Sequence, residues 1–253
     1  MKQTTQDSSW KSLYWVGGVA ALLAAIIFRR NLSAEFSLLR MTGVFSAGPT
    51  EAPSAAADWF ALLQSNPFIG LTYLDVFDLV NYMLVGLIYL ALYLALRRIN
   101  AGWMAVATVL GLMGVVVYLA SNQAFAMLAL SDRYAAATTE AQRATFLAAG
   151  EALLVSYQAA GIPASLLLVT LAGLIISLVM RRSRVFGGAT AYIGIVAQGI
   201  LLCYFVALAF APVLLFLPPT LSAPLLLVWY ILVGLRLLRL ARGAAAEEGG
   251  NTR

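Results

Sequence analysis

The stretch YLASNQAFAMLALSDRYA (118–135) determines the predicted fold, because an apolar pattern continues in it past the point where a membrane helix should end. The residues before it, 101–121, are already enough for one crossing. A helix from Ala101 to Ser131 would be about 46 Å long, whereas the hydrocarbon core of a bilayer is about 30 Å thick. Roughly ten residues should therefore project beyond the membrane, unless the helix tilts strongly. The projecting apolar side chains that need a partner are Phe125, Met127, Leu128 and Leu130.

The next segment, TTEAQRATFLAAGEALLVSYQAAG (138–161), can supply that partner. Gln142 follows Thr139 at the spacing of a capping box, and Gly161 with Pro163 marks an expected helix end. We predict that the two segments form a helical hairpin outside the membrane, and that the stretch SDRYAAAT is the turn that joins them. The alternative is one continuous, strongly tilted fourth helix with a proline kink, but residues 139–180 are far longer than one crossing needs. The side chains available for packing are Phe146, Leu147, Leu153, Leu154 and Tyr157.

The composition is that of a polytopic membrane protein. Of the 253 residues, 62% are hydrophobic and only 11% are charged, and the mean hydropathy is +0.89. A soluble domain has about 25% charged residues, so the charges here are too few to cover a water-facing surface. We predict an all-α bundle of about six transmembrane helices within residues 13–240. The expected spans are 13–28, 72–96, 101–121, 163–180, 187–210 and 222–240.

The segments outside these spans are predicted from their polarity and length. Residues 1–12 form a polar cytoplasmic tail, and 241–253 a cytoplasmic tail expected to be disordered. The outer segments are 31–70 and 122–161. The first contains an irregular stretch at 47–57. The flanking stretches FSLLRMTGVF and WFALLQSNPFIGL are too short to cross and are expected at the interface, with Trp59 and Phe60 at headgroup depth.

The distribution of charge predicts the orientation. With both termini in the cytoplasm, most Lys and Arg residues lie inside and most Asp and Glu residues outside, as the positive-inside rule requires. Arg29 and Arg30 go against this rule locally. Residues 13–28 also resemble a secretory signal peptide, but no small-x-small cleavage site stands beside them, so we favour a retained span. The predicted location is the inner (plasma) membrane.

Several chemistries are excluded by the residues that are missing. The chain has no histidine, one cysteine (Cys203) and only two lysines, Lys2 and Lys11, both near the N-terminus. Haem ligation by His, the usual zinc sites, an intrachain disulfide and a Schiff base in the bundle are thereby excluded. No nucleophile–base pair or phosphate loop occurs. We expect no metal and no cofactor, and an enzyme is the least favoured class of function.

One face of the second span is unusually polar. Its residues recur every three or four positions, which places them on one side of a helix: Asp75, Asp78, Tyr82, Gly86, Tyr89 and Tyr93. Intramembrane carboxylates by default indicate an ion or substrate path. The alternative is structural, because acids in the first helical turns cap free amides and complement the helix dipole. Arg133 or Arg143 would then pair with them.

Other spans contribute small and polar residues. Two spans have a face of small and polar residues, which favours close helix packing. The face of the third span consists of Gly111, Gly114, Tyr118 and Asn122, and that of the fifth span of Gly187, Ala191, Gly194 and Gln198. The amides of Asn122, Gln123 and Gln198, with Tyr82 and Tyr118, form either a modest internal network or an outward-opening pocket. Glu151 and Gln158 could face the same opening. The arginines at 181–184 indicate a topology determinant or a contact with anionic lipid.

Three stretches resemble a known family: ASNQAFAMLALSDRYAAATTEAQRATFLAAGEALL (120–154), AYIGIVAQGILL (191–202) and APLLLVWYILVGLRLL (223–238). They are similar to the uncharacterised prokaryotic membrane family catalogued as domain of unknown function 4386. The resemblance covers roughly residues 10–240. It implies a multi-pass prokaryotic membrane protein with no established activity, and it supplies no catalytic residues.

Two classes of function follow. The first is a non-enzymatic envelope or partner-associated membrane subunit, with the lipid bilayer and another membrane protein or a second copy as partners, and no nucleic acid. The alternative is a small transporter or ligand-binding protein. Its ligand or ion pathway would use Asp75, Asp78, Tyr82, Asn122 and Gln198. The polar interior favours this alternative, and the absence of a convincing inverted repeat counts against a transporter.

Overall fold

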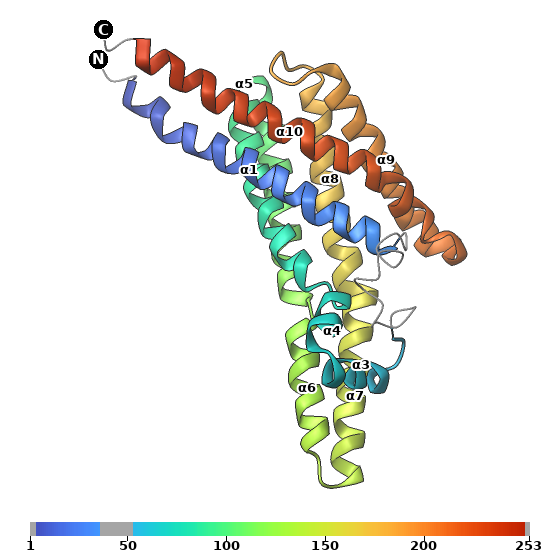
Figure 1. Cartoon of the computed structure of the whole chain (residues 1–253). Coiled ribbons are helices and arrows are strands. Elements are labelled where there is room, and N and C mark those ends of the chain that lie inside the picture. Colours follow the sequence, from blue (N-terminus) through green and yellow to red (C-terminus); the bar gives the residue numbers. More distant parts are fainter. Residues whose placement is uncertain (1–3, 36–52, 251–253) are drawn as a thin grey trace.

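The computed structural model describes the backbone of residues 4–35 and 53–250, and the side chains of residues 10–27 and 53–243. All regular elements in these ranges are helices, so the predicted all-α class is confirmed (Figure 1). The elements are α1 (Thr4–Glu35), α3 (Ala56–Ser65), α4 (Pro67–Tyr73), α5 (Val76–Ser121), α6 (Ala124–Ala136), α7 (Glu140–Ser156), the π-helical turn η1 (Tyr157–Gly161), α8 (Ile162–Met180), α9 (Gly188–Phe210), the 3₁₀ turn η2 (Pro212–Leu214) and α10 (Leu217–Gly250).

Within the described residues, five helical segments are long and apolar enough to cross a membrane. They are Trp10–Ile27, Val76–Ala136, Glu140–Met180, Gly188–Phe210 and Pro212–Gly243. Six spans were predicted, and two of them, 72–96 and 101–121, overlap Val76–Ala136, which is 61 residues long. The first of the two begins at Val76, since Thr72 and Tyr73 belong to α4. The backbone of α5 leaves helical geometry at Asn100 (φ −155°, ψ 92°), and Asn100 Oδ1 accepts a hydrogen bond of 3.1 Å from Trp103 N.

The two arms of α5 fold back on each other around Asn100. Gly86 in the first arm lies beside Leu112 in the second, and Tyr89 lies against Gly111. As the residue number rises in the first arm, that of its partner in the second arm falls, so the two arms form an antiparallel helix pair.

Apolar side chains cover the outward face of the second α5 arm. Trp103, Val109 and Val116 are 56%, 56% and 64% exposed, and Val106 and Met113 are exposed between them. The spacing of three or four residues places all five on one face. A continuous apolar face of this kind is unfavourable in water but matches lipid. Together with the long apolar helices, this indicates an integral membrane protein.

Glycines allow the long helices to approach closely, in places backbone to backbone. A Cβ added at Gly234 of α10 would lie 3.0 Å from the carbonyl oxygen of Gly18 in α1, and these two helices lie side by side (Figure 1). A Cβ at Gly194 of α9 would lie 2.5 Å from Trp229 Nε1 of α10. A Cβ at Gly114 of α5 would lie 3.0 Å from Ser165 O of α8. The packing role predicted for these small-residue stripes is therefore confirmed at Gly114 and Gly194.

The expected continuous helix from Ala101 to Ser131 is wrong, because the chain leaves helical geometry at Asn122 and Gln123. The cause is local. Asn122 Oδ1 accepts a hydrogen bond of 3.0 Å from Ala124 N, which gives the backbone an alternative to the helical ladder. The rest of the apolar stretch starts a new helix, α6.

The apolar side of α6 packs against both α7 and α3. Met127 and Leu154 are buried together with Trp59, Phe60 and Leu63 in a second hydrophobic core, separate from that of the long helices. Trp59 and Phe60 are 3% and 1% exposed, so both side chains are covered by protein, and their expected position at headgroup depth stays a prediction. Their partner is the α6–α7 pair, which the short segment could not reveal. Of the two interfacial stretches, FSLLRMTGVF lies outside the described residues.

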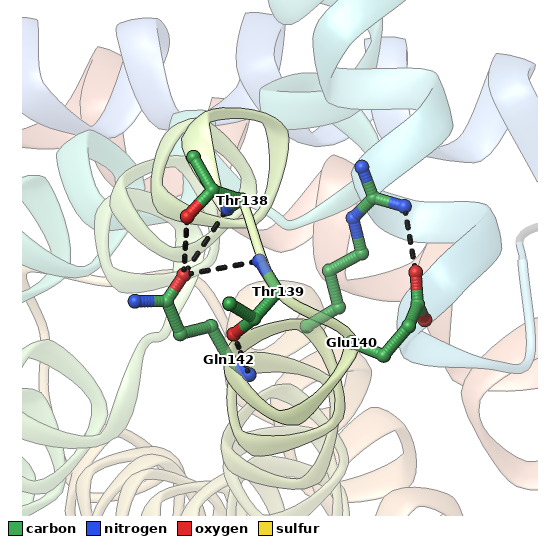
Figure 2. Close-up of polar contacts among 5 residues, drawn as sticks. Thr138, Thr139, Glu140 and Gln142 are labelled. Carbon is green, nitrogen blue, oxygen red and sulfur yellow. Dashed lines mark hydrogen bonds and ion pairs between the residues drawn. The ribbon is translucent and has the colours of Figure 1, made fainter.

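Helix α7 begins at the predicted capping box. The Thr139 hydroxyl accepts a hydrogen bond of 3.3 Å from Gln142 N, and Gln142 Oε1 accepts from Thr139 N at 3.4 Å and from Thr138 N at 3.1 Å (Figure 2). Three backbone amides at the exposed end of the α6–α7 turn thus have a hydrogen-bond acceptor. The predicted helix end at Gly161 is instead the π turn η1, from which α8 continues to Met180.

The C-terminal ends of the first and last helices differ from the sequence predictions. Helix α1 runs to Glu35, through Arg29 and Arg30, which were expected to close the first span. Helix α10 continues to Gly250, although residues from 241 were expected to be disordered. The GAAAEE run explains this second difference, since Ala and Glu are strong helix formers.

We predict that Gly194→Ala destabilises the protein relative to Gly199→Ala, a matched control on the same helix. A Cβ at Gly199 meets nothing within 4 Å, whereas one at Gly194 meets buried Trp229. Both variants gain about 1 kcal/mol of helix propensity, but only Gly194→Ala is overpacked, which costs about 1–3 kcal/mol. Thermal unfolding in detergent, followed by circular dichroism, measures the difference. Equal melting temperatures would contradict close packing at Gly194.

Candidate functional site

A cavity of about 330 Å³ lies between α5, η1, α8, α9 and α10. Six residues singled out from the sequence line it: Asp75, Asp78, Tyr82, Tyr89, Tyr118 and Gln198. They come from both arms of α5 and from α9, so the fold gathers residues that are up to 123 positions apart in the sequence (75 to 198). The antiparallel packing of the α5 arms brings Tyr82 against Tyr118, with ring centroids 3.8 Å apart and planes inclined by 3°.

Tyr157 links the carboxylate end of the cavity to α5. Its hydroxyl donates to Asp75 Oδ2 at 3.0 Å, lies 3.0 Å from the Tyr118 hydroxyl, and accepts from Asn122 Nδ2 at 3.3 Å. Asn122 does not line the cavity, but its Nδ2 also lies 3.3 Å from the carbonyl oxygen of Leu74. These contacts join the start of α5, the α5–α6 break and η1 at one place.

The main chain at Asp75 is unusual. Asp75 has φ 59° and ψ 32°, in the left-handed region that non-glycine residues rarely adopt, although Asp is among those that tolerate it. It precedes the first turn of α5, yet its side chain makes no capping hydrogen bond there. The structural alternative, in which Asp75 caps the helix, is therefore wrong for this residue. Asp78 does lie in the first turn, where its charge complements the helix dipole.

The remaining polar candidates lie elsewhere. Glu151 Oε1 accepts a hydrogen bond of 2.6 Å from Ala56 N, so it caps α3. Gln158 is exposed, and Gln123 precedes the first residue of α6. Arg143, expected as a partner for Asp75 or Asp78, pairs with Glu140 at 3.0 Å.

Aromatic rings form much of the cavity surface. Tyr118 meets Tyr157 edge to face, with centroids 6.3 Å apart. Tyr89 also lines the cavity, and its hydroxyl donates to the carbonyl oxygen of Val169 at 2.9 Å. Tyr204 and Tyr230 line the cavity from α9 and α10. Tyrosines from four helical elements, α5, η1, α9 and α10, therefore line one cavity.

Two residues that line the cavity each have a buried polar atom without a hydrogen-bond partner among the described residues. Asn81 is 7% exposed and Thr170 is fully buried, and neither Asn81 Oδ1 nor Thr170 Oγ1 makes a hydrogen bond within the described structure. A buried polar group without a partner is costly, so such groups usually meet water or a ligand. Both atoms can accept a hydrogen bond from a bound molecule.

Sequence reasoning did not single out Tyr157, Thr170, Tyr204 or Tyr230 for this site. Tyr157 was assigned to packing, because nothing in the local pattern predicts the π turn that carries it. In the described residues, no group of three or more His, Cys, Asp and Glu side chains is arranged to hold a metal ion.

The chain matches no family model, no curated protein and no solved structure. The resemblance to domain of unknown function 4386 therefore stays a prediction, and the function has to be argued from the geometry of this chain.

We predict that Tyr157→Phe lowers the stability by about 1–2 kcal/mol, because three hydrogen bonds are lost and interhelical bonds in membranes average about 0.6 kcal/mol each. Thermal unfolding in detergent measures the loss. Tyr204→Phe is the matched control, because the Tyr204 hydroxyl makes no hydrogen bond among the described residues. Equal effects of the two substitutions would show that the Tyr157 hydroxyl has no special structural role.

Proposed function

We propose that this protein binds a small organic cation, such as an amine or a quaternary ammonium compound, in the cavity at Asp75 and Asp78. The observation that carries the proposal is that two carboxylates and several tyrosines line the same cavity. Every charged residue among the described lining residues is acidic. A low-dielectric cavity of this charge favours a cation over an anion or a neutral molecule.

The tyrosine rings support the same class of ligand. A cation within about 6 Å of an aromatic centroid is attracted by the ring quadrupole, and the attraction grows when the cation leaves water. The stacked Tyr82 and Tyr118 and the neighbouring Tyr157 supply such rings beside Asp75. Asn81 Oδ1 and Thr170 Oγ1 add two acceptors for N–H groups.

The size of the cavity limits the ligand. Small-molecule pockets measure about 300–1,000 Å³, so a cavity of about 330 Å³ suits a small molecule at the lower end of this range. This geometry favours the ligand-binding or transporter class over a partner-associated subunit. Uptake into proteoliposomes would separate a transporter from a binding protein.

We also propose the membrane topology in which the cavity opens. The two α5 arms count as separate crossings, which makes six, and α6 with α7 projects on the outer side. The first turn of α1 and the last turn of α10 lie at the same end as the α8–α9 connection, opposite α6 and α7 (Figure 1). The arginines at 181, 182 and 184 favour the cytoplasm for that end, in a plasma membrane.

We predict that small amines and quaternary ammonium ions raise the melting temperature of the purified protein, whereas carboxylates of similar size do not. At a hundredfold excess over the dissociation constant, binding adds about 2.7 kcal/mol, or roughly 5–10 °C for a chain of this length. Asp75→Asn and Asp78→Asn should remove this shift. Asp132→Asn, an exposed acid on α6, is the control that should retain it. The proposal would be refuted if no cation raised the melting temperature of the wild-type protein. It would also be refuted if both cavity variants kept the same ligand-induced shift as the wild type.

We predict that cysteines at positions 136 and 188 react with an impermeant maleimide from opposite sides of the membrane. Ala136 is exposed at the end of α6, and Gly188 is exposed with open space around its Cα. The native Cys203 is exposed and must first be replaced by serine. Labelling of both positions from the same side would refute the six-crossing topology without affecting the ligand proposal.

A further inference from the structure

A second and larger cavity, of about 590 Å³, lies where α5 bends and α8 gives way to α9. It is lined by Asn100 and Trp103 of α5, by Leu178 of α8, by Arg181 and Arg182, and by Tyr192 of α9. It shares no lining residue with the cavity at Asp75. We propose that this cavity is a binding site for an anionic phospholipid, with the phosphate at the two arginines and an acyl chain against α8.

The charge of the cavity fits a phosphate. Arg181 and Arg182 are both exposed, and no acidic residue is among the residues that line the cavity. Arginine presents a planar set of N–H donors that matches a phosphate in a bidentate way. The Arg181 guanidinium lies over the Tyr192 ring, 5.3 Å from the centroid, which holds it at the edge of the cavity.

The rest of the lining fits the apolar part of a lipid. The α8 residues that precede Arg181 in the cavity lining are apolar: Ile175, Leu178 and Val179. Ile99 of α5 also lines the cavity. Leu178 is 46% exposed, so the protein itself does not cover this surface. A chain that extends from the arginines along α8 would cover it.

Two exposed aromatic side chains mark the expected depth. Trp103 and Tyr192 are each 56% exposed and flank the cavity from different helices. Trp and Tyr gather where lipid headgroups meet hydrocarbon, because their rings are apolar and their N–H or O–H groups are polar. Basic pockets between helices at this depth are suited to acidic headgroups. A soluble anion would use the arginines but would leave the apolar part empty.

The test is retention of lipid by the purified protein. The protein in detergent receives equal amounts of dioleoyl phosphatidylglycerol and dioleoyl phosphatidylcholine, and native mass spectrometry counts the lipids retained. We expect selective retention of phosphatidylglycerol and a roughly tenfold weaker retention in Arg181→Gln with Arg182→Gln. Arg98→Gln with Arg239→Gln removes the same charge from exposed positions outside the cavity and should retain the lipid.

A second variant tests the apolar part without changing charge. Leu178→Trp places bulk in the cavity and should also reduce retention of phosphatidylglycerol, so the test remains decisive if the double arginine variant does not fold. Equal retention of the two lipids by the wild-type protein, or undiminished retention in Leu178→Trp, would overturn the proposal. Full competition by inorganic phosphate would also overturn it, because it would show a site for a soluble anion.

Discussion

Close contact between helix backbones is the constraint on which the rest of this structure depends. Lipid is as apolar as the helix surfaces, so the hydrophobic effect does not hold the helices together inside a membrane, and packing must do so. Gly18 meets Gly234 between α1 and α10, and Gly194 meets Trp229 between α9 and α10. Gly111 receives Tyr89 and thereby closes the two arms of α5. Each long helix in the bundle is thus held at a distance that a larger side chain would not allow.

Two irregularities in the backbone lie opposite each other within this packed frame. The α5–α6 break follows Ser121, and a Cβ at Gly161 in the π turn would lie 2.5 Å from Ser121 Cβ. Both segments therefore approach closely at the level where Asn122 and Tyr157 form a hydrogen bond. π-helical turns are rare and often occur at functional sites. Here the turn carries the tyrosine hydroxyl that contacts Asp75.

The two cavities have opposite chemistry. One is lined by carboxylates, tyrosines and unpaired acceptors, and the other by arginines beside an aromatic and aliphatic surface. Asp75 and Asp78 line the first cavity and Arg181 and Arg182 line the second, so each cavity carries charge of one sign among its described lining residues. A cation would be favoured in the first cavity and an anionic headgroup in the second, so each site would exclude the ligand of the other.

The sequence by itself determined the all-α class, the approximate limits of α8 and α9, the capping box at Thr139 and the polar face of the second span. These features depend on composition and on contacts between residues close in sequence, which a local pattern records. Only the tertiary structure decided that Trp59 and Phe60 are buried, and that Tyr157, Tyr204 and Tyr230 join Asp75 around one cavity. The physical reason is that these outcomes require segments distant in sequence to pack together. A tyrosine in an apolar helix faces lipid or a cavity according to which helix lies beside it, and no local pattern specifies that neighbour.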